Sequence, residues 1–172
     1  MSKSKNEIVA ELNRIEVDSV YSAKGHFNTA SSWRRWNYSF GIPAAIASAV
    51  AGVSALSSFD NHDLVAAVLA VAVAVLTSLM TFLNPSDQAA THHAAGNRYN
   101  SLKNRSRIAA NVEATTLSVA ELASRMSELA LERDELNEQS PQIPRRAFER
   151  AQSGIAAGEA SYDSDESGAN DG

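Results

Sequence analysis

The sequence predicts an all-α integral membrane protein, in which a two-helix transmembrane hairpin lies between an N-terminal amphipathic helix and a long C-terminal cytoplasmic helix. Residues 64–83 include no charged side chain, and twenty helical residues at about 1.5 Å each span about 30 Å, the thickness of the bilayer hydrocarbon. Residues 36–59 are also uncharged, and only residues 60–63 separate the two stretches, so two spans here would run antiparallel. Both flanking segments are polar, with apolar residues at helical spacing.

Residues 1–35 are expected to form the cytoplasmic amphipathic helix. Their apolar side chains recur at spacings of three to five residues, which places most of them on one stripe of a helix. A helix of this kind buries its apolar stripe, either in its own chain or against a second copy. The stripe consists of Ile8, Leu12, Ile15, Val20, Ala23, Phe27 and Ala30.

Residues 36–83 are the predicted hairpin, with spans at about 38–59 and 64–83 and an outer loop at 60–63. The loop contains two aspartates and no lysine or arginine, whereas basic residues lie near the other end of each span. The positive-inside rule therefore places both termini in the cytoplasm and the loop outside. These basic residues are Lys24, Arg34, Arg35, Arg98, Lys103, Arg105 and Arg107. The alternative to spanning is an alanine-rich hairpin buried in a soluble helical bundle.

Residues 84–140 are expected to form the long cytoplasmic helix. Its start has three helix-initiation signals, because Asn84 can act as N-cap, Pro85 suits the first helical position and Asp87 places an acid in the first turn. A proline at this junction also predicts a kink between the second span and the new helix.

The same helix carries a signal for a break near residues 111–118, where β-branched residues precede a capping box formed by Ser118 and Glu121. Its distal half has apolar positions at alternating spacings of three and four, which is typical of a short coiled-coil stripe. The stripe consists of Val112, Thr115, Val119, Leu122, Met126, Leu129, Arg133 and Leu136. We expect this stripe to pack against the N-terminal helix and across subunits.

Residues 141–172 are expected to be a disordered acidic tail. The chain has a net charge of −5, but residues 151–172 carry five carboxylates and no lysine or arginine, so residues 1–150 are electrically neutral. This end of the chain is rich in glycine, serine and aspartate and offers hardly any apolar side chain to bury, which favours disorder.

Two sets of residues in the spans are candidates for contacts within an assembly. In span one, small side chains four residues apart allow close approach of backbones, either to another copy or to span two. This face consists of Ala44, Ser48, Gly52 and Ala55. In span two, a polar stripe could line a pore, although hydroxyls in membrane helices more often bond to the carbonyl four residues back, the interpretation that we favour. This stripe consists of Thr77, Thr81 and Asn84.

A basic cluster follows the second span, and it could hold an anionic nucleotide or a lipid headgroup. The simpler interpretation, which we favour, is that these residues set the topology. The cluster consists of Arg98, Lys103, Arg105 and Arg107.

The sequence contains no pattern typical of a catalytic centre. A glycine-rich phosphate loop, a nucleophile elbow, a paired acid and a catalytic triad are all missing, and cysteine is absent. His92 and His93 are adjacent, so on a helix they point about 100° apart and cannot bind one metal ion together. We therefore expect a protein that is not an enzyme, with no catalytic residue, no metal site and no cofactor.

The order of these segments forms a recognisable pattern. A polar helix ending in aromatic residues leads into "GIPAAIASAVAGVSAL", a very short loop follows, and the second span closes on "TFLNPSDQAATHHAAGNRYNSLKNR". Over roughly residues 15–110 the chain resembles the SLATT family, bacterial two-transmembrane effector domains associated with SMODS nucleotidyltransferases and SLOG sensor domains. The most specific part of the resemblance consists of Asn84, Pro85, His92, Tyr99 and Leu102.

The resemblance implies an effector of an anti-phage conflict system that is linked to a nucleotide signal. Such an effector would reside in the bacterial inner membrane, oligomerise, and form pores or disrupt the membrane, which leads to cell death. The implied partners are membrane lipid, further copies of the chain and a nucleotidyltransferase- or sensor-linked signalling protein, with no nucleic acid. A holin-like lysis protein and a passive membrane anchor or scaffold are the two alternatives.

Overall fold

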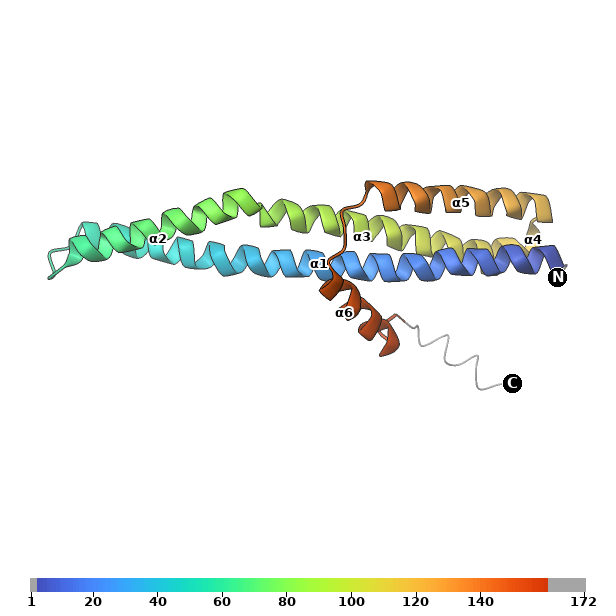
Figure 1. The fold of residues 1–172 in the computed structure, drawn as a ribbon, viewed down its shortest axis with the longest axis horizontal. Helices are drawn as coiled ribbons and strands as arrows, with labels where there is room; N and C mark the ends of the chain where they lie inside the picture. Colours follow the sequence, from blue (N-terminus) through green and yellow to red (C-terminus); the bar gives the residue numbers. More distant parts are fainter. Residues whose placement is uncertain (1–2, 161–172) are drawn as a thin grey trace. The chain divides into compact units, whose positions relative to one another are not determined.

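A computed structural model describes residues 3–160, and this part of the chain contains helices and no strand (Figure 1). The helices divide between two compact units, which we call the hairpin unit (residues 30–90) and the bundle unit (residues up to 29 together with those from 91 onward). The elements in chain order are α1 (Lys3–Ala55), α2 (His62–Leu83), α3 (Pro85–Ile108), a π-helical turn (Ala109–Glu113), α4 (Ala114–Thr116), α5 (Val119–Gln139) and α6 (Arg145–Ala156).

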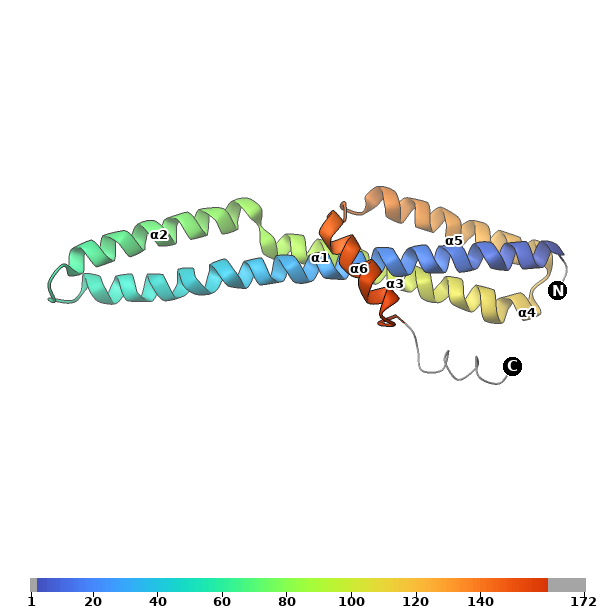
Figure 2. The ribbon, with the colours of Figure 1, turned by 60° about the horizontal axis from the view of Figure 1, so that its bottom comes forward.

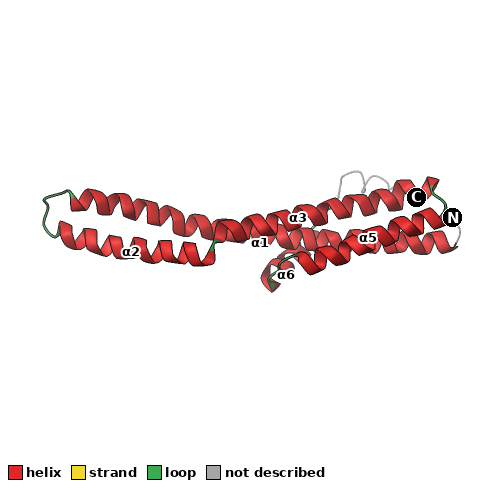
Figure 3. Ribbon diagram, turned by 90° about the horizontal axis from the view of Figure 1, so that it is seen from above, coloured by secondary structure: helices red, strands yellow, loops and turns green. Residues whose placement is uncertain are grey.

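The hairpin unit pairs the C-terminal half of α1 with α2, and the two run side by side in all three views (Figures 1, 2 and 3). On each helix the partly covered residues recur at spacings of three and four, the pattern of antiparallel helices in contact. On α1 they include Phe40, Gly41, Ala44, Ala47, Ala51 and Ser54, and on α2 Ala66, Leu69, Val73, Leu76 and Met80. The contact is therefore lined by small side chains on α1 and by larger ones on α2.

The loop of the hairpin is longer than predicted. We expected residues 60–63, but α1 ends at Ala55 and α2 begins at His62, so residues 56–61 connect them. Ser57 donates its hydroxyl to the carbonyl of Val53 at 2.7 Å, which satisfies a carbonyl at the end of α1. Asn61 has a φ of 64°, a left-handed conformation that asparagine tolerates better than most residues, and α2 starts directly after it.

The predicted boundary at residue 35 is not a boundary in the structure, because α1 continues without a break from Lys3 to Ala55. Pro43 lies inside this helix, where it lacks the N–H that would bond to the carbonyl of Ser39. Pro85 is the first residue of α3, as its sequence context predicted, and Asp87 lies in the first turn. Asn84 precedes it with a φ of 41° and donates its backbone N–H to the carbonyl of Met80 at 2.9 Å, so it also closes α2.

The bundle unit packs the first part of α1 against α3, α5 and α6. Its core contains stripe residues from both polar arms: Leu12, Ile15, Ala23, Tyr99, Leu102, Leu122, Leu129 and Leu136. The leucines of the C-terminal stripe, which we expected to pack against the N-terminal helix and across subunits, are therefore buried within a single chain. Val112 and Val119, at the start of that predicted stripe, are exposed.

The long C-terminal helix of the prediction is two antiparallel helices, α3 and α5, and the chain turns at residues 117–118 (Figure 2). The turn lies within the stretch 111–118 where we expected a break. Ser118 accepts the N–H of Glu121 at 3.3 Å, and the Glu121 carboxylate accepts the N–H of Ser118 at 2.9 Å, which completes the capping box. Folding back lets the leucines of α5 reach the core, which a continuous helix would carry away from it.

Residues 145–156, which we expected to be disordered, form α6. The buried residues of this helix are small (Ala147, Ala151 and Gly154), and they allow it to lie close to α1. The backbone carbonyl of Ala147 accepts a hydrogen bond from the Asn28 side chain at 3.3 Å. We predicted disorder because this segment has few large apolar side chains. Small residues can nevertheless pack closely against another helix without them. The remainder of the predicted tail, residues 161–172, lies outside the described residues.

Candidate functional site

The outer surface of the hairpin unit is apolar. Both of its helices are long and apolar enough to cross a membrane, and none of the residues of α2 is buried. The exposed large side chains include Ile42, Ile46, Val53, Leu64, Val68, Val71, Val75 and Phe82. In a soluble bundle such a hairpin would be covered by protein, whereas here many of its large apolar side chains are exposed. The alternative requires a buried hairpin, and within the described residues this hairpin is largely exposed.

The small-residue face of span one is mostly turned away from α2. Ala44 is half-buried in the contact with α2, but Ser48, Gly52 and Ala55 are exposed. A Cβ added at Gly52 would meet no atom within 4 Å. Within one chain, packing against the second span therefore accounts for Ala44 alone.

The polar stripe of span two is exposed as well, and the hydroxyl of Thr81 bonds within its own helix, as does that of the neighbouring Ser78. Thr81 donates to the carbonyl of Thr77 at 2.9 Å, and Ser78 donates to the carbonyl of Ala74 at 2.7 Å. This is the back-bonding that we favoured over a pore lining. Asn84 is exposed at the end of α2, where its backbone has the capping role described above.

A buried polar cluster lies between α1, α3 and α5 in the bundle unit. His26 and His92 place their Nδ1 atoms 2.9 Å apart, and the ring of His26 stacks on Tyr99 with a centroid distance of 5.5 Å. Tyr99 donates its hydroxyl to the Asn137 side-chain oxygen at 2.8 Å. His92, Tyr99 and Leu102, the α3 residues that carry the family resemblance, are therefore buried together on one side of the helix.

The sequence argument missed His26. Its signal was available, because His26 lies between Ala23 and Ala30 on the apolar stripe of α1, three and four residues away from them. What could not be predicted was its partner, which is 66 positions away in the sequence.

Burial disfavours the charged form of both histidines. It lowers the pKa of His26 to about 4, with a further contribution from the neighbouring His92, and it also lowers the pKa of His92. Burial likewise raises the pKa of Tyr99. At neutral pH both imidazoles are therefore uncharged, and one Nδ1 donates a hydrogen bond to the other. Among the described residues no group of three or more His, Cys, Asp or Glu side chains is arranged to hold a metal ion.

The basic residues after the second span do not form one cluster. Arg98 donates to the side chain of Gln139 at 3.1 Å, and Arg105 forms an ion pair with Glu132, so both link α3 to α5. Arg107 is exposed, whereas Lys103 is buried and lines a cavity on another side of α3. These four side chains therefore do not converge on a single anion.

A family model described as "SMODS and SLOG-associating 2TM effector domain family 4" matches residues 9–167. No curated protein and no solved structure matches the chain significantly. The matched range includes both apolar helices, the buried histidines and α6.

Proposed function

Because the chain belongs to the SMODS and SLOG-associating 2TM effector domain family 4, we propose that it is a membrane effector of a bacterial conflict system that assembles into oligomers and permeabilises the inner membrane. The observation that carries this proposal is the hairpin unit, whose large apolar side chains point outward along both helices. Such a surface is compatible with lipid and unfavourable in water.

The proposed orientation has both termini in the cytoplasm. Arg34 and Arg35 are exposed on α1 before the apolar stretch, and the loop at residues 56–61 has Asp60 and no basic residue. By the positive-inside rule, this difference in basic residues between the two ends of the hairpin supports a cytoplasmic bundle unit and an external loop.

Permeabilisation requires several copies, since two helices cannot enclose a channel. The exposed Ser48, Gly52 and Ala55 offer a surface on which backbones of neighbouring copies can approach closely, and close packing is a main source of helix association in lipid. Leu122, Leu129 and Leu136 of α5 do not serve this purpose, because they are buried within their own chain. We therefore assign assembly to the hairpin and assign the bundle unit to contact with a nucleotidyltransferase- or sensor-linked partner.

Regulated expression in bacteria with a membrane-potential dye tests the proposal. We expect loss of membrane potential and arrest of growth after induction, or after induction together with a nucleotidyltransferase- or sensor-linked signalling partner. Lysis that needs a co-expressed endolysin would instead support the holin-like alternative. A membrane-inserted chain that leaves the potential intact under both conditions would contradict a permeabilising effector and support an anchor or scaffold.

A further inference from the structure

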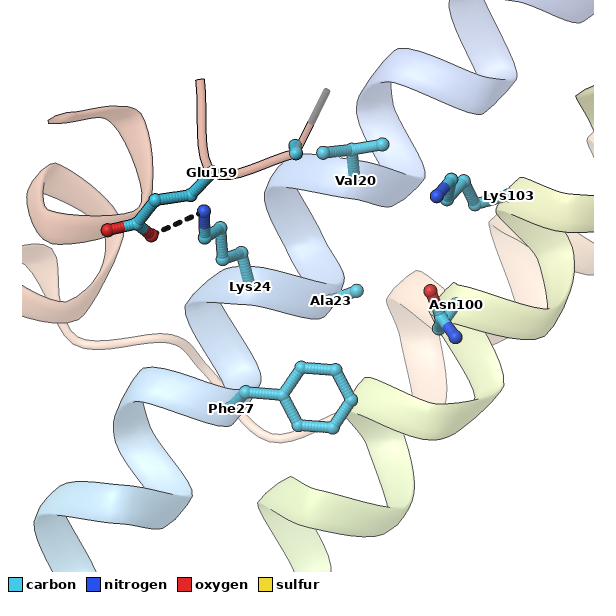
Figure 4. A pocket seen from close by; sticks show the side chains of 8 residues that line it. Val20, Ala23, Lys24, Phe27, Asn100, Lys103 and Glu159 are labelled. Carbon is cyan, nitrogen blue, oxygen red and sulfur yellow. Dashed lines mark ion pairs between the residues drawn. The ribbon is translucent and has the colours of Figure 1, made fainter. Parts of the chain in front are cut away.

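The bundle unit contains a cavity of about 210 Å³ between α1, α3 and the turn that follows α6 (Figure 4). Two lysines line it, Lys24 from α1 and Lys103 from α3, together with the amide of Asn100. Phe27 forms an apolar wall, and Glu159 contributes a carboxylate from the segment after α6. The lining thus carries two ammonium groups and one carboxylate.

The ammonium of Lys24 is short of acceptors. Its nitrogen is shielded from solvent and lies 2.6 Å from a carboxylate oxygen of Glu159, and no other ion pair or hydrogen bond of this group is formed within residues 3–160. An ammonium has three N–H groups to donate, and a buried charge is costly unless it is both paired and hydrogen-bonded. The cavity therefore has unused capacity for an anion.

The backbone conformation after α6 positions Glu159 at this cavity. Gly158 has a φ of 86°, its N–H donates to the carbonyl of Ile155 at 3.0 Å, and the N–H of Glu159 donates to the carbonyl of Gly154 at 3.0 Å. This left-handed helix end turns the chain back over Gly154. A Cβ at Gly154 would overlap the Glu159 carboxylate and would lie 3.2 Å from the nitrogen of Lys24.

The backbone positions Glu159 next to Lys24, but the ion pair between them is weak enough for an anionic ligand to replace the carboxylate. Although the Lys24 nitrogen is shielded, the side chain of Glu159 is 62% exposed, so water can compete for its carboxylate, and an ion pair that is open to solvent on one side contributes little to stability. A phosphate group carries more charge than a carboxylate and has three acceptor oxygens, so it can satisfy more of the N–H groups that face the cavity.

We propose that this cavity is a binding site for a small phosphate-bearing anion, whose phosphate replaces the Glu159 carboxylate at Lys24 and contacts Lys103 and Asn100. Phe27 then covers the less polar part of the ligand. The phosphate can belong to a soluble phosphate ester or to a lipid headgroup, and both have the same chemistry at the two lysines. The site is in the bundle unit and does not depend on whether the hairpin forms a pore.

The test uses the full-length protein in nanodiscs of zwitterionic lipid, with pyrophosphate as the probe in isothermal titration calorimetry. We expect saturable binding by the parent. Glu159→Gln removes the competing carboxylate and should tighten binding about fivefold, the factor that corresponds to an exposed ion pair of about 1 kcal/mol. Lys24→Gln and Lys103→Gln should each weaken binding at least about tenfold, as expected for a lost charge-assisted contact. Lys3→Gln, which changes an exposed lysine of the same helix, is the matched control and should bind as the parent does.

A second set of nanodiscs that contains phosphatidylglycerol identifies the source of the phosphate. If a headgroup occupies the cavity, pyrophosphate binding should weaken in these discs for the parent but not for Lys24→Gln. If the ligand is soluble, the affinity should be the same in both lipids. Glu159 is exposed, so its variant should fold normally, and its result is decisive. Equal affinities of Glu159→Gln and the parent, or no saturable binding by either, would overturn the proposal.

Discussion

At the scale of single residues, the paired imidazoles of His26 and His92 make the stability of the bundle unit depend on pH. The pKa of His26 is about 4 in the folded chain and near 6.5 when unfolded, so the unfolded state binds protons more readily. The stabilisation is therefore complete above pH 6.5 and is lost as the pH falls from there toward 4. At about pH 5, His26 alone should reduce the free energy of unfolding by about 2 kcal/mol.

Thermal unfolding followed by circular dichroism in mild detergent measures this effect. The fall in Tm between about pH 7.5 and about pH 5 should be smaller when His26→Gln and His92→Gln are combined, because no imidazole is then left to protonate. His93→Gln is the control, since His93 is exposed and lies outside the buried pair. An identical fall in the double variant would mean that other groups control acid stability.

Also at the residue scale, Gly52 tests whether the small-residue face of α1 joins copies of the chain. A Cβ at Gly52 meets no atom within 4 Å in its own chain, so the effect of Gly52→Leu should arise between chains. The added side chain favours insertion but prevents backbones from approaching closely. We expect normal abundance in the membrane and loss of the membrane depolarisation that we propose for the parent.

The neighbouring residue provides the matched control. Val53→Leu enlarges an apolar side chain that is already 68% exposed on the adjacent surface of α1, and it should keep depolarisation. Depolarisation by Gly52→Leu at parental membrane abundance would exclude this face as the working interface.

At the scale of elements, the fold-back of α5 should determine the stability of the bundle unit. Leu129 is 1% exposed, so Leu129→Ala should lower the free energy of unfolding by about 2–5 kcal/mol. Ser118→Ala removes the helix cap and should lower it by about 1 kcal/mol. Leu131→Ala, two residues away on the exposed side, should change it by less than about 0.5 kcal/mol. Chemical denaturation followed by circular dichroism measures the free energy of unfolding of each variant and thus tests this order of effects.

The same variants separate packing within the chain from a coiled coil between chains. Because Leu129 is buried within one chain, Leu129→Ala should lower stability without changing the oligomer size measured by light scattering in detergent. Dissociation of the oligomer by this variant at a temperature where the helices persist would restore the coiled-coil interpretation.

Local sequence signals predicted much of the helical structure but not the pairing of helices. Pro85 and the capping box at Ser118 act through neighbouring residues, so a pattern of a few residues is enough to predict the helix starts that they mark. The direction of α5 depends on which leucines can be buried together, and that is a property of the whole bundle. The existence of α6 depends on small residues such as Ala151, whose contribution appears only once the surface of α1 is in place.

The polar sites also depend on contacts between helices that local sequence signals do not predict. His92 and Lys103 were both identified as candidates from the sequence, yet each acts with a partner that periodicity alone does not indicate. His92 pairs with His26 on α1, and Lys103 shares a cavity with Lys24 and Glu159. Neither pairing leaves a local motif, because the residues come from helices that are far apart in the sequence.

At the scale of the whole molecule, the two units have opposite distributions of apolar residues. The bundle unit buries its large apolar side chains, such as Leu12 and Leu136, as a protein in water does. The hairpin unit instead exposes large apolar side chains, such as Ile46 and Phe82. One chain is thus suited to two solvents, and in the function that we propose, the orientation of the hairpin across the membrane decides which compartment the bundle unit faces.

Cysteine labelling can measure that orientation directly, because the chain has no cysteine of its own. We expect Ser58→Cys, in the exposed loop of the hairpin, to react with a membrane-impermeant maleimide in cells whose outer membrane has been opened. Ser58 is a better position than Asn61, where the left-handed backbone with a φ of 64° disfavours cysteine. Ser4→Cys and Gln142→Cys, both exposed in the bundle unit, should react only after the inner membrane is disrupted. Labelling of Ser58→Cys only after disruption would place the loop in the cytoplasm and contradict the orientation that the basic residues favour.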